Sequence, residues 1–152
     1  MTQHVLHGCW TEPEGAETSG EPVFQAIDGG KDHFVIRDGV RFAGTHLILD
    51  LWGADRLDDQ DHIERALRQI VEKAKATLLH IHLHRFTPNG GISGVAVLAE
   101  SHISVHTWPE RGYAAFDVFM CGNAQPERSV EVLRQMFSPG RVDVKTYLRG
   151  RV

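Results

Sequence analysis

A strongly amphipathic helical pattern at residues 59–75 precedes several strand-like segments, and a second helical pattern follows them. Apolar side chains recur here every three or four residues, which is typical of a helix that buries one face. The recurring positions are Ile63, Ala66, Leu67, Ile70, Val71 and Ala74. Asp58 or Asp59 can cap the N-terminus, and Lys73 and Lys75 suit the C-terminal end of the helix dipole. Such a helix must cover another element, because it cannot bury its apolar face alone.

Apolar runs and alternating apolar and polar residues predict the strands that this helix covers. The predicted strands span residues 45–52, 77–86, 95–100, 113–120 and 142–148. Residues 103–108 either extend the third strand or form their own, and turns are predicted at 88–91 and 110–112. A second helix is expected after Pro126, ending at Pro139-Gly140. This order predicts an α+β fold, a two-layer α/β sandwich with helices on one face of a largely antiparallel sheet.

The N-terminal region has a different composition. Residues 12–31 contain five acids, one base and few large apolar groups, so they cannot bury enough surface to offset their ordering entropy. We expect residues 1–40 to form a mobile extension, with docking of residues 23–27 left open, and residues 41–152 to form one domain. His4, His7 and Cys9 are metal-ligand types, but no fourth ligand accompanies them.

Charge and cysteine content narrow the function classes. The formal net charge is −4, and the basic residues are scattered, which argues against a nucleic-acid surface. No apolar run approaches the roughly 20 residues that span a bilayer, and no leader pattern is present. Cys9 and Cys121 do not form a disulfide framework or a metal motif. A cytoplasmic protein with a small-molecule partner, and no nucleic-acid or membrane partner, is expected.

Residues 100–121 concentrate chemically active side chains. They include a hydroxyl at Ser101, imidazoles at His102 and His106, an indole at Trp108 and a thiol at Cys121. Core packing does not require this density of functional groups. The order Glu-Ser-His, three residues, then His-Thr-Trp-Pro-Glu resembles the self-cleaving, pyruvoyl-dependent S-adenosylmethionine decarboxylases of bacteria and archaea. The similarity extends over residues 43–122 and includes Gly44 and Asp50-Leu51-Trp52-Gly53.

The resemblance implies that the chain makes its own cofactor. Ser101 Oγ would attack the carbonyl of Glu100, and cleavage between residues 100 and 101 would leave a pyruvoyl group derived from Ser101. It also implies a homodimer of cleaved chains, in which two sheets face each other in an αββα assembly with active sites at or near the interface. A sheet with helices on one face independently needs cover on the other, which a symmetric dimer would supply.

Residue roles follow from the same resemblance. His106 and Ser93 are expected to act in processing, and Cys121 is expected to donate a proton. An imidazole and a thiol of suitable pKa are both chemically able to do so. Substrate-binding roles are implied for Phe86, which would pack on adenine, for Trp108, which lies beside the site, and for Glu110, which would hold ribose hydroxyls or a positive charge. Core packing remains the alternative for the two aromatic residues, and His102 is either structural or part of the site.

The turn before Ser93 departs from the family pattern. It reads Pro88-Asn89-Gly90-Gly91-Ile92-Ser93-Gly94, one residue longer than usual. Because this turn is expected beside the substrate, the extra residue concerns recognition of the adenosyl group more than self-cleavage. The expected activity is decarboxylation of S-adenosylmethionine for polyamine (spermidine) synthesis. The first alternative is a pyruvoyl-dependent decarboxylase of free arginine or ornithine.

The second alternative is a His-rich metal protein, because His80, His82 and His84 would share one strand face, with His102 and His106 on another segment. A third alternative, an uncleaved and catalytically silent homologue, is disfavoured because Ser93, Ser101, His106 and Cys121 are all present.

Overall fold

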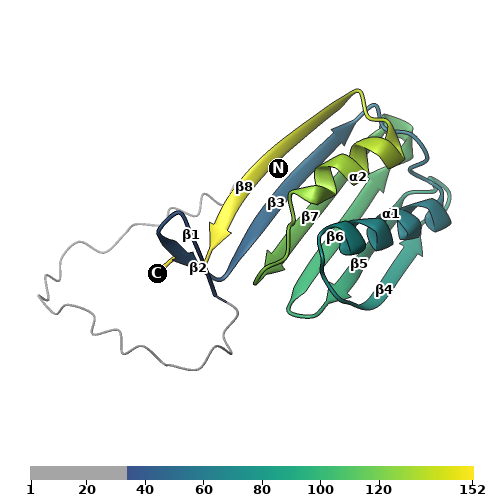
Figure 1. Ribbon diagram of the computed structural model, residues 1–152. Helices are drawn as coiled ribbons and strands as arrows, with labels where there is room; N and C mark the ends of the chain where they lie inside the picture. Colours follow the sequence, from purple (N-terminus) through teal and green to yellow (C-terminus); the bar gives the residue numbers. More distant parts are fainter. Residues whose placement is uncertain (1–33) are drawn as a thin grey trace, which may run out of the picture.

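The computed structural model describes residues 34–152, which form two helices and two sheets (Figure 1). The strands are β1 (Val35–Arg37), β2 (Val40–Phe42), β3 (Gly44–Trp52), β4 (Leu78–Arg85), β5 (Ile92–Leu98), β6 (Ser101–Trp108), β7 (Tyr113–Cys121) and β8 (Arg141–Arg149). The helices are α1 (Gln60–Lys73) and α2 (Arg128–Phe137), and a short 3₁₀ turn spans Pro109–Arg111.

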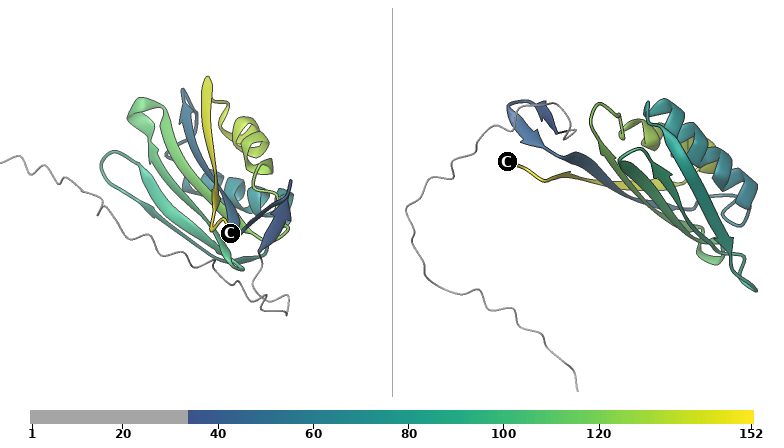
Figure 2. Two further views of the ribbon diagram at one scale, coloured as in Figure 1. Left: turned by 90° about the vertical axis from the view of Figure 1, so that its left-hand side faces the viewer. Right: turned by 90° about the horizontal axis from the view of Figure 1, so that it is seen from below.

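The main sheet has six strands in the order β4-β5-β6-β7-β3-β8, and all neighbouring strands run antiparallel. Helices α1 and α2 pack on the same face of this sheet, as the view from below in Figure 2 shows. The predicted α+β sandwich with a largely antiparallel sheet is therefore confirmed.

The sequence explains why α1 forms and where it begins. The side chain of Asp59 accepts a hydrogen bond of 2.9 Å from the His62 backbone N–H, which is N-cap geometry. Ile63, Leu67 and Ile70 are fully buried along one stripe of the helix. They pack against the alternate residues of the strands that point toward the helices, such as Leu49, Leu51, Ile103, Val105, Phe116 and Val118.

The strands alternate between two environments. On β6, Ser101, Ile103, Val105 and Thr107 are buried, whereas His102, Ser104, His106 and Trp108 point the other way. We call the second side the open face, because within residues 34–152 no helix covers it (Figure 2). The open face carries His, Asp, Ser and aromatic side chains, among them His46, Ser104 and Tyr113, because alternate residues of a strand point to opposite faces.

Two parts of the structure differ from the sequence expectations. The third strand was predicted to run through Glu100, but β5 ends at Leu98, and the chain reverses at Ala99 and Glu100 so that Leu98 pairs with Ser101. The hairpin of β1 and β2 crosses the expected boundary at residue 40, with β1 inside the range of the extension and Phe42, at the end of β2, 1% exposed. The domain boundary remains a prediction. His4, His7, Cys9 and residues 23–27 lie outside the described residues.

Neither helix within residues 34–152 has the length and apolar character needed to cross a membrane.

Candidate active site

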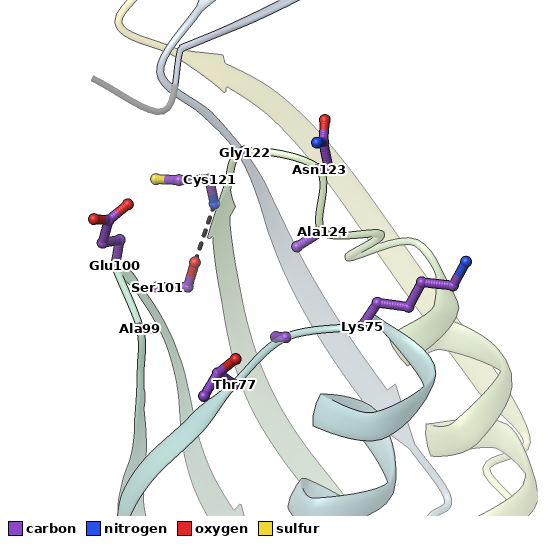
Figure 3. Close-up of a pocket in the computed structure, with 10 residues that line it drawn as sticks. Lys75, Thr77, Ala99, Glu100, Ser101, Cys121, Gly122, Asn123 and Ala124 are labelled. Atoms are coloured by element: carbon purple, nitrogen blue, oxygen red, sulfur yellow. Dashed lines mark hydrogen bonds between the residues drawn. The ribbon is translucent and has the colours of Figure 1, made fainter. Parts of the chain in front are cut away.

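The predicted self-cleavage site lies in a pocket between the ends of β6 and β7 and the end of α1 (Figure 3). The pocket has a volume of about 220 Å³. Its lining residues are Lys75, Ala76, Thr77, Ala99, Glu100, Ser101, Cys121, Gly122, Asn123 and Ala124, and we call it the Ser101 pocket. Three of the predicted site residues, Glu100, Ser101 and Cys121, therefore meet in one place.

Ser101 sits just after a sharp reversal of the chain. Glu100 has φ 61°, in the left-handed region, a conformation that costs a non-glycine residue about 1–2 kcal/mol. The Ser101 side chain is buried, and its Oγ accepts a hydrogen bond of 3.1 Å from the Cys121 backbone N–H. The peptide bond between Glu100 and Ser101 thus lies in a strained turn beside an ordered hydroxyl.

Cys121 carries its thiol in the protonated form. Burial raises the pKa of this thiol, and the negative charge of Glu100 raises the pKa further. In Figure 3 the Cys121 thiol and the Glu100 carboxylate point to the same side of the pocket. A protonated thiol suits a proton donor better than a nucleophile, because nucleophilic cysteines react as thiolates.

The remaining predicted site residues line a second pocket at the opposite end of β6. This pocket has a volume of about 240 Å³ and is lined by Phe86, Asn89, Gly91, Ser93, His106, Thr107, Trp108 and Glu110. We call it the His106 pocket. Ser93 and His106 are directly opposite each other on β5 and β6, with 2.8 Å between Ser93 Oγ and His106 Nδ1. Sequence reasoning placed both residues in processing, and the structure brings them into hydrogen-bond contact.

Aromatic rings form a stack that starts at the His106 pocket. Trp108 is 39% exposed and stacks on Tyr113 at a centroid distance of 5.1 Å, and Tyr113 stacks on Trp52 at 4.4 Å. The Arg141 guanidinium lies 5.3 Å from the Trp52 ring centroid. Tyr113 donates a hydrogen bond of 2.6 Å to Asp50, and burial together with this carboxylate raises the pKa of Tyr113 to about 12. The core alternative for Trp108 and Phe86 is wrong, because both rings are substantially exposed.

A single copy of the chain does not bring the two pockets together. Ser101 and His106 are five positions apart on β6 and point to opposite faces, and a strand of that length spans about 17 Å. Ser93 and His106 therefore cannot reach the bond between Glu100 and Ser101 in the same copy. Each pocket has its own hydrogen-bonded pair, Cys121 with Ser101 in one and Ser93 with His106 in the other. The roles of these residues stay predictions.

The other histidines have separate surroundings. His46 Nε2 lies 3.1 Å from Asp117 Oδ1 on the open face, and His102 packs against Phe119 nearby. The side chains of His80 and His82 are exposed on β4, and the His84 ring packs edge-on against Phe86 at 4.6 Å. Within residues 34–152, no group of three or more His, Cys, Asp or Glu side chains is arranged to hold a metal ion. The described residues thus give the metal-protein alternative no support.

Sequence reasoning did not identify several polar residues at these sites. Lys75, Thr77 and Asn123 line the Ser101 pocket, and Tyr113 supports Trp108. None of the four belongs to a motif, and their proximity depends on the order of strands in the sheet. Alternation on β7 signals that Tyr113 shares a face with Asp117, but not which neighbouring strand it meets.

Comparison with known proteins shows which family the chain belongs to. The family model described as S-adenosylmethionine decarboxylase matches residues 45–150. An S-adenosylmethionine decarboxylase proenzyme from Thermomicrobium roseum is 44% identical over 110 residues, covering 72% of this chain and 95% of that protein. A proenzyme of the same name from Methanococcus vannielii is 49% identical over 112 residues, covering 72% and 91%.

A solved structure shares the fold. The crystal structure of the adenosylmethionine decarboxylase from Aquifex aeolicus VF5 superposes with a TM-score of 0.64 at 36% identity, covering 73% of this chain and 93% of that one. The chain therefore belongs to the S-adenosylmethionine decarboxylase family.

Proposed function

We propose that this protein is a self-processing, pyruvoyl-dependent decarboxylase of S-adenosylmethionine, which supplies decarboxylated S-adenosylmethionine for polyamine synthesis. The observation that carries the proposal is the Ser101 pocket, where an ordered serine hydroxyl follows a strained residue and lies beside a protonated thiol. Family membership supports the choice of substrate.

Self-cleavage begins at the turn between β5 and β6. Ser101 Oγ attacks the carbonyl carbon of Glu100, the C–N bond breaks, and an ester forms while the hydroxyl proton passes to the released amine. Loss of the Ser101 α-proton then breaks the ester, leaving Glu100 as a free carboxylate. Tautomerisation and hydrolysis release ammonia and leave a pyruvoyl group at residue 101. The left-handed φ of Glu100 raises the energy of the uncleaved state and so favours the first step.

The Ser101 pocket fits the group that this chemistry would leave. Residue 101 is held at the pocket wall, where the Cys121 backbone N–H already points at the Ser101 Oγ. When present, the pyruvoyl group supplies a carbonyl that binds the substrate amine and accepts the electrons released with carbon dioxide. Cys121 Sγ holds a proton at neutral pH and donates it to the substrate α-carbon after carbon dioxide leaves.

The active site is completed by a second copy of the chain. Each pocket holds only 220–240 Å³, below the roughly 300–1,000 Å³ typical of small-molecule sites. The open face of the sheet carries His106 and Trp108 and has no cover within residues 34–152. Cys121 of the Ser101 pocket lies on this face too, at the end of β7. An isologous dimer through this face would set the turn at Glu100 of one copy beside the His106 pocket of the other. Ser93 and His106 would then act on the scissile bond of the partner.

Substrate binding falls to the His106 pocket. Phe86 and Trp108 line this pocket and have exposed rings, and aromatic faces suit both a purine and a sulfonium cation. Glu110 lies at the same pocket and offers a carboxylate to ribose hydroxyls. No described residue favours free arginine or ornithine as the substrate, so these amino acids serve as comparison compounds in the test.

Intact mass spectrometry under denaturing conditions tests the proposal. Wild-type protein and a Ser101→Ala variant are treated with cyanoborohydride and S-adenosylmethionine, arginine or ornithine in separate reactions. We expect wild type to give two chains, residues 1–100 and 101–152, with a covalent adduct on the second from S-adenosylmethionine alone. The S101A variant should remain one chain. An uncut wild-type chain after prolonged incubation would contradict self-processing, and an adduct from arginine or ornithine alone would reassign the substrate.

A further inference from the structure

Thr107 lies between two residues of the His106 pocket but faces the other way. Its neighbours His106 and Trp108 project from the open face, whereas the Thr107 side chain is 6% exposed and points toward the helices. A hydroxyl in this position is removed from water and must find partners within the protein.

The Thr107 hydroxyl has two such partners, from two other parts of the chain. Its Oγ1 accepts a hydrogen bond of 2.8 Å from the Ile92 backbone N–H at the start of β5. The same Oγ1 donates a hydrogen bond of 2.7 Å to the Leu57 carbonyl oxygen, in the connection between β3 and α1. One side chain therefore joins β6, β5 and that connection.

The bond to Ile92 lies at the place where the backbone pairing of β5 and β6 ends. The last paired residues of these strands are Ser93 and His106. Beyond them, the N–H of Ile92 bonds to the Thr107 side chain instead of a backbone carbonyl. The Thr107 backbone oxygen also limits Gly91, where a Cβ atom would come within 2.9 Å of it. The start of β5 is thus held against β6 by contacts to this one residue.

We infer that Thr107 is a positioning residue for the Ser93–His106 pair. Its hydroxyl fixes the start of β5, and so keeps Ser93 Oγ within 2.8 Å of His106 Nδ1. The inference rests on the proposed function, in which this pair acts in processing. The turn before β5 contains Gly90 and Gly91 in succession, and Gly90 has φ 72°. Glycines give this turn little stiffness of its own, so the position of the start of β5 depends more on its contacts with Thr107.

Three variants separate positioning from simple stability. Thr107→Val keeps the shape but removes both hydrogen bonds, whereas Thr107→Ser keeps the hydroxyl and loses a methyl group. Ser129→Ala is the matched control, because Ser129 is fully buried and donates a 2.6 Å hydrogen bond to the Pro126 carbonyl oxygen at α2. Each protein is made by cell-free synthesis, and the fraction cleaved between residues 100 and 101 is followed over time. Thermal unfolding is measured in parallel.

We expect T107V to cleave about tenfold or more slowly than wild type, because small displacements of reacting groups cost large factors in rate. T107S should stay within about threefold of wild type, since its hydroxyl keeps both partners. S129A should cleave at the wild-type rate at temperatures where it is folded. If T107V cleaves as fast as S129A, the positioning role is overturned.

A second variant is used if T107V does not fold. Thr107→Cys then replaces it, because a thiol keeps the size of the side chain and hydrogen-bonds weakly. Cleavage of T107C at the wild-type rate would overturn the inference, and slow cleavage would support it.

If wild type itself is never cleaved, the proposed function fails. If wild type cleaves and the variants do not differ from it, only the role of Thr107 fails.

Discussion

Ser101 and His106 lie on one strand, β6, yet their side chains leave the sheet on opposite faces. The peptide bond that is proposed to break and the imidazole that is proposed to assist are thereby about 17 Å apart in one copy. This separation means that the two groups do not meet within one copy of the chain. Under the proposed function, His106 acts on the bond before Ser101 only when the two residues come from different copies of the chain.

Glu100 provides a test of strain at the cleavage site. Glu100→Gly removes the cost of a left-handed φ at this position. We expect the variant to cleave several-fold more slowly, because about 1 kcal/mol of ground-state strain corresponds to about fivefold in rate. The rate is read by intact mass spectrometry. Glu100→Gln is the control, since it removes the charge and keeps the strained backbone. Cleavage of E100G at or above the rate of E100Q would rule out a contribution from strain.

Cys121 predicts a specific pH dependence of turnover. Burial and the charge of Glu100 raise the pKa of its thiol above the ordinary value of 9.0, so the donor form persists above that pH. We expect the basic limb of the kcat profile to lie above that value. Cys121→Ala should lose about 10²-fold or more in kcat and should also lose this limb. Cys9→Ala, which removes the other cysteine of the chain, should keep the wild-type profile. An unchanged kcat in C121A would exclude the thiol as proton donor.

The raised pKa of Tyr113 makes the stability of the fold sensitive to alkaline pH. Its folded pKa of about 12 exceeds the ordinary value of 10.0, so the unfolded chain loses this proton first. The contribution of Tyr113 to stability is complete below pH 10 and is lost as the pH rises toward 12. Urea unfolding of uncleaved S101A protein between these values should show a decline. In the S101A/Tyr113→Phe double variant this decline should be smaller, and an equal decline would contradict the assignment.

Tyr113 also predicts a selective effect on substrate affinity. Its ring stacks on Trp108 at the His106 pocket, so Tyr113→Ala should raise KM for S-adenosylmethionine with little change in kcat. Tyr113→Phe keeps the stack and should leave KM near the wild-type value. Steady-state kinetics on fully cleaved protein would measure both. Equal KM values for the alanine and phenylalanine variants would show that stacking on Trp108 has no part in binding.

Most of the fold could be predicted from the sequence, because each element has its own periodicity. The helix capped by Asp59 and the strands around Leu49 and Phe116 follow from spacing alone. The reversal at Ala99 and Glu100 could not be predicted, because these residues are not turn formers and the alternation reads through them. Tertiary pairing of Leu98 with Ser101 overrides that local pattern.

The site was predicted as a set of residues but not as an arrangement. The spacing of Ser101 and His106 in the sequence does not give their separation in space, because a strand advances about 3.3 Å per residue and alternates the faces of its side chains. Ser93 and His106 meet only because β5 and β6 pair in one register. Register and strand order depend on the whole sheet, so the contacts of Thr107 and Tyr113 could not be predicted from the motif.

Co-expression of two inactive chains tests the two-copy site most directly. One chain carries Ser101→Ala and the other His106→Ala, with different affinity tags. If the site combines Ser101 of one copy with His106 of the other, a mixed dimer contains one intact site, and about a quarter of all sites are restored by random pairing. We predict that H106A chains are cleaved between residues 100 and 101 only when S101A chains are present. Failure of the mixture to cleave any H106A chain, or cleavage of H106A protein expressed alone, would contradict the account.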